Sequence, residues 1–195
     1  ALKIKNGNNA NMYTLFIINN PNLTCIEADA ATPSAGLSAW STTIDSQHLF
    51  SVSCSTTALT YVPDNAFEAY LETHAADGSA VTLGASNSMG NGIANDDHVF
   101  TNSINTVTNL QVPNLSIAVL TGIEDFAALE VLNCQGNNLV SLDFSQNGFL
   151  KDLICRNNQL TSLQVSSNAL LTNLDVYNNQ LPALNLTNNS AMISL

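Results

Sequence analysis

Apolar residues recur at fixed positions in the C-terminal part of the chain. Three segments of 21 residues, 129–149, 150–170 and 171–191, align without gaps. Their shared apolar columns begin with Leu132, Leu153 and Leu174, and continue two positions later with Cys134, Cys155 and Val176. One such unit cannot bury its own apolar face, so units of this length must stack to make a core. The pattern predicts a solenoid with one parallel strand per coil.

Asparagines form two further columns in the same register. Asn137, Asn158 and Asn179 follow the predicted strand, and Asn147, Asn168 and Asn189 lie at the other turn. A side-chain amide there can bond the backbone groups left free where the chain turns, so we interpret both columns as internal ladders. Together with the leucines they resemble the LxxLxLxxNxL pattern of leucine-rich repeats. We therefore predict an α/β solenoid of 21-residue leucine-rich repeats with parallel strands, a short helical cap and a disulfide-closed lid.

The segment before these repeats is predicted to start the array. Residues 105–126 look like a degenerate first coil at a spacing of 22, so the coils span 108–195. Residues 62–73 predict a short helix, because Pro63 and Asp64 suit a helix start and Phe67, Tyr70 and Leu71 make one apolar face. Segment 76–97 is rich in Gly, Asn and Ser and predicts an irregular loop. Residues 62–107 are thus the expected N-terminal cap.

The N-terminal residues match the repeats a second time. Segment 15–26 aligns with 142–153, and Leu2 aligns with Leu132 if about three extra residues lie in the intervening turn. We interpret 1–26 as the last coil of a preceding array, 27–55 as the lid that closes it, and 56–61 as a linker.

The four cysteines fall into two kinds. Cys25 and Cys54 flank the predicted lid, and a disulfide between them would stabilise it by about 3 to 4 kcal/mol in the chain-entropy model; two free thiols are the alternative. Cys134 and Cys155 replace aliphatic residues at inward positions of adjacent strands. We predict them to be buried, reduced and inert.

Four motifs, in this order, resemble those of secreted leucine-rich-repeat surface proteins of Bacteroidota, the flavobacterial type especially. They are KNGNN (5–9), NNPNLTCI (19–26), VPDNAFEAYL (62–71) and LTGIEDFAAL (120–129), joined by the NNQLTSL-like phrase of the repeats. The resemblance implies a large secreted or surface-attached protein, often an adhesin, without shared catalytic residues.

The two ends of the chain fall on the same column of the repeat, at Leu2 and Leu195. The sequence begins at Ala1, and we expect it to be part of a longer polypeptide. One hypothesis is a tandem unit or a subunit that stacks end to end, since contacts that do not close make fibres. An arbitrary fragment of a larger protein is the alternative.

Charge narrows the possible partners. Four Lys and Arg face fifteen Asp and Glu, for a net charge of −11, and only 10% of residues are charged. Nucleic acids and anionic membrane surfaces need clustered cations that this chain lacks. No apolar run is long enough to cross a bilayer, so membrane insertion is not expected. A neutral, hydrogen-bonding surface of this kind indicates an extracellular or cell-surface location.

Candidate chemistry is sparse. His48, His74 and His98 are scattered, and Asp96 and Asp97 do not fit the spacing of an EF-hand. No nucleophile or phosphate-binding motif is present. We predict no catalytic residues, metal or cofactor, and therefore no enzyme.

The predicted binding surface is the outward strand face, which we expect to be concave. Its residues flank the inward columns and are Asn133, Gln135, Ile154, Arg156, Asp175 and Tyr177. Arg and Tyr are favoured anchors at interfaces. The alternative is that this face is plain solvated surface without a ligand. We expect adhesion or scaffolding through a protein or glycan ligand. The alternatives are a fibre built from copies of the chain end to end, and a glycan or protein recognition module of a larger secreted enzyme.

Overall fold

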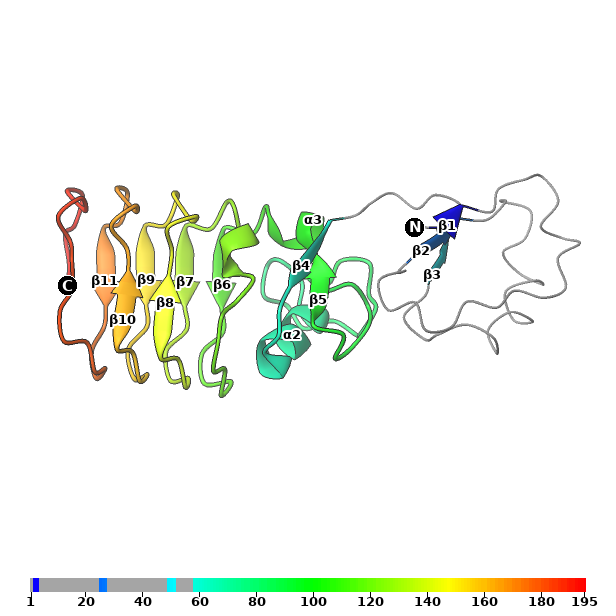
Figure 1. Cartoon of the computed structure of the whole chain (residues 1–195), viewed down its shortest axis with the longest axis horizontal. Coiled ribbons are helices and arrows are strands. Elements are labelled where there is room, and N and C mark those ends of the chain that lie inside the picture. Colours follow the sequence, from blue (N-terminus) through cyan, green and yellow to red (C-terminus); the bar gives the residue numbers. More distant parts are fainter. Residues whose placement is uncertain (1, 4–24, 28–48, 52–57) are drawn as a thin grey trace, which may run out of the picture. The chain divides into compact units, whose positions relative to one another are not determined.

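The computed structural model describes residues 2–3, 25–27, 49–51 and 58–195 (Figure 1). The chain divides into two compact units, 1–57 and 58–195. Each unit is described by itself.

Parallel strands repeat in the first unit. Strands β1 (Leu2–Lys3), β2 (Cys25–Glu27) and β3 (Leu49–Ser51) form one sheet in that order, with Leu2 opposite Ile26 and Ile26 opposite Phe50. The predicted alignment of Leu2 with the Ile26 position is thus confirmed. Strand β3 lies in the segment 27–55 that was predicted as a lid, so parallel pairing continues past residue 26, where the sequence analysis ended the coil. The motif asparagines are missing around Leu49, which is why the repeat was not recognised there.

The second unit opens with a small α/β cap. Strand β4 (Leu59–Tyr61) pairs antiparallel with β5 (His98–Phe100), and helix α2 (Asn65–Glu72) and the short helix α3 (Thr101–Ile104) lie between and after them. The linker predicted for 56–61 is therefore too long, because Leu59–Tyr61 is paired within the cap. Helix α2 begins later than predicted, since Asp64 serves as its N-cap.

Four coils follow the cap. Strands β6 (Asn109–Gln111), β7 (Val131–Asn133), β9 (Asp152–Ile154) and β11 (Asn173–Asp175) form a four-stranded parallel sheet (Figure 1). Leu110, Leu132, Leu153 and Leu174 face one another along it. The short 3₁₀ helix η2 (Ile123–Asp125) lies in the first coil. The steps of 22, 21 and 21 residues between these leucines confirm the predicted register, including the degenerate first coil.

Two coils carry a second strand that the sequence analysis did not predict. Strands β8 (Ser141–Asp143) and β10 (Ser162–Gln164) pair in parallel, with Leu142 opposite Leu163. In each, one buried leucine lies between two exposed polar residues. Three residues with a single leucine are too short for a strand pattern to be distinguished from a compact turn, so the sequence predicted only one strand per coil.

The cap and the coils share one hydrophobic core. Phe67 of α2 and Phe126 of the first coil are fully buried, with ring centroids 6.2 Å apart. The Asp64 carboxylate accepts hydrogen bonds from Ala66 and Phe67 through Oδ1 and from Ala118 and Val119 of the first coil through Oδ2. Helix α2 therefore covers the start of the array, as predicted for a capped solenoid.

Candidate functional site

The outward side of the four-stranded sheet presents the six predicted binding residues. Because side chains alternate along a strand, the leucine of each strand points into the core and its two neighbours point outward. The outward residues of the middle and last strands are half-buried or exposed, whereas Leu132, Leu153 and Leu174 are buried. Parallel register aligns Asn133, Ile154 and Asp175 across three strands. The remaining three predicted residues, Gln135, Arg156 and Tyr177, follow two positions later in each coil.

Arg156 connects three coils on this face. Its Nε donates to Gln135 Oε1 over 2.7 Å, and a terminal guanidinium nitrogen lies 3.4 Å from Asp175 Oδ2. The side chains of Arg156 and Asp175 are 45% and 36% exposed, so this ion pair contributes little to stability. Its effect is to hold the guanidinium between Gln135 and Asp175, with donors still available to a ligand.

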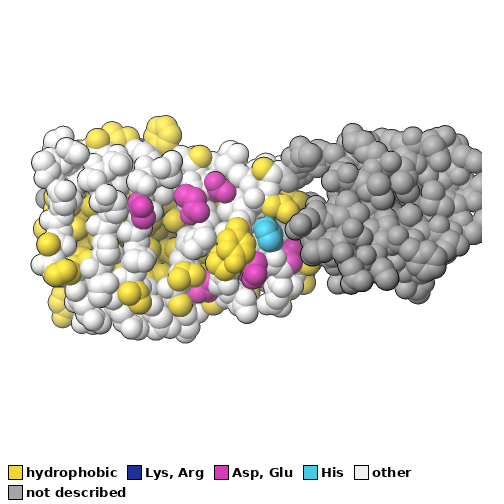
Figure 2. Space-filling view, in the orientation of Figure 1, with side chains coloured by type: hydrophobic (Ala, Val, Ile, Leu, Met, Phe, Trp, Pro, Cys, Tyr) yellow, Lys and Arg dark blue, Asp and Glu magenta, His cyan; other side chains and the backbone are white. Residues whose placement is uncertain are grey.

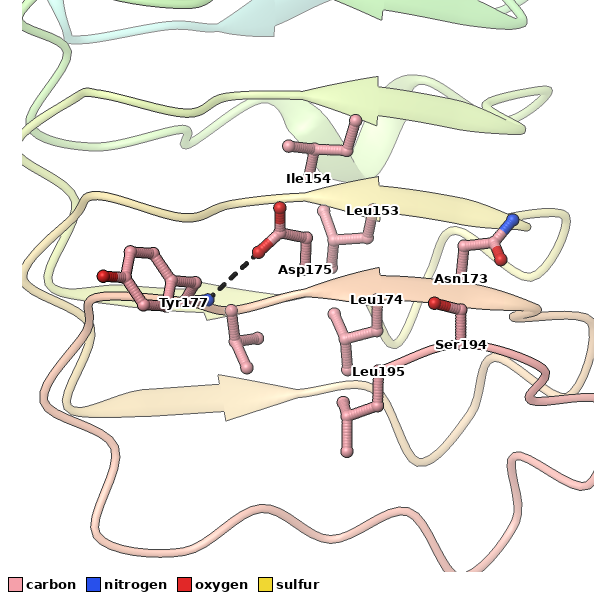
Figure 3. A pocket seen from close by; sticks show the side chains of 9 residues that line it. Leu153, Ile154, Asn173, Leu174, Asp175, Tyr177, Ser194 and Leu195 are labelled. Atoms are coloured by element: carbon pink, nitrogen blue, oxygen red, sulfur yellow. Dashed lines mark hydrogen bonds between the residues drawn. The ribbon is translucent and has the colours of Figure 1, made fainter.

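Tyr177 extends the same face at the last described strand. It is 75% exposed, and its backbone N–H donates to the Asp175 carboxylate. An open hollow of about 490 Å³ lies beside these residues and is lined by Ile154, Asp175 and Tyr177 together with the column Leu153, Leu174 and Leu195 (Figure 3). Three of the six predicted residues therefore border one concavity.

The first asparagine column forms a ladder inside the solenoid. Asn158 Nδ2 donates to the carbonyls of Cys134 and Cys155, and its Oδ1 accepts from Leu139 N–H. Asn137 and Asn179 make the corresponding bonds one coil before and one coil after. These side chains have little left to offer a ligand.

The second asparagine column uses only the nitrogen atoms of its side-chain amides. Asn147, Asn168 and Asn189 each donate Nδ2 to two backbone carbonyls of the preceding coil or its turn. Their Oδ1 atoms are buried and have no protein donor. The column thus links the turns through its amide nitrogens alone.

The described cysteines lie in the core. Cys134 and Cys155 are fully buried free thiols on adjacent coils. Burial, with the neighbouring Asp175 charge, raises the pKa of Cys155 to about 12, and burial, with the neighbouring Cys155, raises the pKa of Cys134 further. Neither thiol is ionised at neutral pH. Cys54, the predicted disulfide partner of Cys25, lies outside the described residues, as does His48.

The two described histidines have local roles. His74 Nδ1 lies 2.9 Å from Tyr70 O, and its ring stacks on Tyr70 at 3.9 Å. His98 Nδ1 lies 2.6 Å from Asp96 O, and its ring is 5.6 Å from Tyr61. Within the described residues, no three His, Cys, Asp or Glu side chains are arranged to hold a metal ion.

Sequence reasoning missed two buried carboxylates in the cap. Glu68 and Glu72 on α2 are each 1% exposed. Their i and i+4 spacing places both on one helix face, and the Gly/Asn-rich loop after the helix is the signal that backbone donors could reach them. The sequence analysis interpreted that loop as irregular only.

The solenoid surface is largely uncharged. Figure 2 shows one face of it, on which a few acidic side chains lie among polar and apolar ones. In the part of the chain that the structure describes, no helix is long and apolar enough to span a membrane.

Comparisons place this fold among known repeat proteins. The functional domain of InlJ from Listeria monocytogenes, which includes a cysteine ladder, matches with 31% identity and a TM-score of 0.56, over 71% of this chain and 28% of that one. An internalin, InlF, from Listeria monocytogenes matches with 20% identity and a TM-score of 0.46, over 69% and 43% of the two chains. This chain therefore spans less than half the length of either. No family model and no curated protein matches it.

The chain is thus a leucine-rich-repeat solenoid, as predicted.

Proposed function

We propose that this chain is an extracellular or cell-surface binding module that recognises a protein partner through the outward face of the four-stranded sheet. The observation that carries the proposal is the network in which Arg156 spans from Gln135 to Asp175 beside the exposed Tyr177. The asparagines of the two ladders are used inside the solenoid, whereas this group faces solvent. Arg and Tyr are the residue types that dominate interface energies.

A protein partner fits this face better than a glycan. Sugar recognition commonly uses several aromatic rings, and Tyr177 is the one aromatic side chain among the six face residues. The face instead combines amides, one guanidinium and one carboxylate, which suit the backbone and side-chain groups of a protein. The internalin InlJ, similar in fold, supports a protein-binding role. The resemblance to Bacteroidota surface proteins, and adhesion as the outcome of binding, belong to the same proposal.

The partner class can be tested with defined probes. The chain, immobilised on beads, is offered a panel of purified extracellular proteins and, separately, a glycan array. Saturable binding to at least one protein, with no glycan bound at comparable concentration, is the expected result. Binding to glycans alone, or to neither panel, would contradict the proposal.

A further inference from the structure

A loop of the cap is fastened to helix α2 by two buried carboxylates. Glu72 accepts hydrogen bonds from the backbone N–H groups of Asn91 (2.5 Å) and Gly92 (2.8 Å). A Cβ added at Gly90 would collide with the same carboxylate, so the loop packs directly on it. Glu72 therefore has a donor for each oxygen.

Glu68, one turn earlier on α2, has a donor for only one of its two carboxylate oxygens. Its Oε1 accepts from Asp96 N–H at 3.0 Å, but its Oε2 is buried and has no donor. Because Asp96 carries a carboxylate of its own, this bond brings two acidic side chains together in one cluster. Two carboxylates that meet in this way can form no hydrogen bond unless one of them carries a proton or a cation lies between them.

The bonds around the pair show which residue would hold the proton. Asp96 already accepts from the Asn91 amide and from His98 N–H, so its carboxylate acts as the acceptor in this cluster. Glu68 has only one backbone donor and is 1% exposed. Burial and the neighbouring negative charges of Asp96 and Asp97 raise the Glu68 pKa, against the lowering effect of the Asp96 N–H.

The surroundings supply no positive side chain. Lys151 and Arg156, the basic residues of the described second unit, are paired with Glu130 and Asp175 on the coils. The titratable groups around Glu68 are four carboxylates and one histidine. The carboxylates are those of Asp64 and Glu72, on or next to α2, and of Asp96 and Asp97 in the loop. The histidine is His98 on β5, whose ring nitrogen bonds the Asp96 carbonyl. Because no third side chain converges with the pair in a metal-holding arrangement within the described residues, a proton fits better than a cation.

We propose that Glu68 and Asp96 share one proton, with Glu68 Oε2–H donating to the Asp96 carboxylate, and that this pair is a pH-sensitive latch holding loop 91–97 on helix α2. The proton comes from solvent and returns to it when the pair ionises. The latch acts on the cap that covers the first coil and is independent of the binding face.

The sign of the pH dependence follows from linkage. A carboxyl group whose pKa is raised by folding stabilises the folded state fully below its unfolded pKa. That contribution is lost as the pH rises from there through the folded pKa. Glu68→Gln keeps a neutral donor toward Asp96 but cannot ionise, so the variant should not lose this contribution.

The experiment compares the thermal midpoints of the full chain and of Glu68→Gln from pH 4.5 to pH 8, with and without calcium or EDTA. The Tm difference should widen in favour of Glu68→Gln as the pH rises, and calcium should leave it unchanged. Glu124→Gln, at an exposed carboxylate of the first coil, is the matched control and should show no widening.

A second readout observes Glu68 itself. The ¹³C shift of its carboxyl carbon, assigned by its loss in Glu68→Gln, should remain that of a protonated acid at a pH where the exposed glutamates have ionised. Parallel Tm curves together with an ordinary titration would overturn the latch. A calcium-dependent rise in Tm that Glu68→Gln abolishes would instead show a cation between the carboxylates and would also overturn it.

Discussion

At the scale of single residues, the asparagines of the first ladder stabilise the fold by bonding backbone groups that are buried inside the solenoid. Asn158 Oδ1 accepts from the buried Leu139 N–H, and its Nδ2 donates to the Cys134 and Cys155 carbonyls, which also accept from the ladder asparagines of the adjacent coils. A buried polar group that loses its partner costs about 1–3 kcal/mol. The periodicity was sufficient to predict this role, because a polar residue that recurs at an inward-facing turn must be bonded to the backbone.

Replacing Asn158 with Ala should therefore lower the free energy of unfolding by about 2 kcal/mol, since it leaves the buried Leu139 N–H unpaired and removes one of the two donors to each carbonyl. Asn138→Ala, at an exposed side chain with a single 3.2 Å bond to Ser116 O, should change it by less than about 0.5 kcal/mol. Urea unfolding followed by circular dichroism measures both. Equal losses in the two variants would mean that the buried hydrogen bonds of Asn158 stabilise the fold no more than the surface bond of Asn138.

The buried thiols make a second residue-scale prediction. With the pKa of Cys155 at about 12 and that of Cys134 raised as well, almost no thiolate exists at pH 8, and the thiolate is the reactive form. Iodoacetamide at pH 8 should leave both unlabelled in the native chain and modify both in guanidinium chloride, as measured by peptide mass spectrometry. Rapid labelling of either cysteine in the native chain would contradict its burial in the core.

At the scale of elements, the sequence predicted some parts of the structure and missed others for identifiable reasons. The inward leucine columns gave the main strands and their register, and Asp64 gave the start of α2. Strands β8 and β10 were missed because each contributes a single inward leucine, and β4 was assigned to a linker because its partner β5 is 39 residues away. Local patterns do not show long-range antiparallel pairing.

Asp64 joins helix α2 to the first coil, so substitutions can distinguish the roles of its two carboxylate oxygens. Asp64→Ala should lose about 2 kcal/mol of stability as a helix cap and as an acceptor for the coil. Asp64→Asn retains one carbonyl oxygen and should lose about half of that.

Amide hydrogen exchange distinguishes the two roles. Exchange at Ala118 and Val119 should accelerate in both Asp64 variants, whereas Ala66 and Phe67 should remain protected in Asp64→Asn. Unchanged protection at Ala118 and Val119 in either variant would mean that Asp64 does not join the cap to the coil.

At the scale of the whole molecule, the two asparagine columns bond the coils to one another from inside the solenoid. The outward sheet face is where Arg, Tyr and amide side chains are held in place by the strands and still meet solvent. The sequence predicted which residues lie there, because outward positions follow from the inward columns. It could not predict that Arg156 bridges Gln135 and Asp175, since side-chain pairing across coils depends on rotamers that periodicity does not fix.

The most direct test of this account is the affinity of face variants for the protein partner found on the panel. Arg156→Ala and Tyr177→Ala should each weaken Kd about tenfold or more, as anchors at the centre of an interface do. The matched control, Ser162→Ala with Gln164→Ala on the exposed side of β10, should leave Kd unchanged. Calorimetric titration of the folded chains gives all three values. If the β10 variant loses affinity while the Arg156 and Tyr177 variants retain it, the four-stranded sheet is not the binding face.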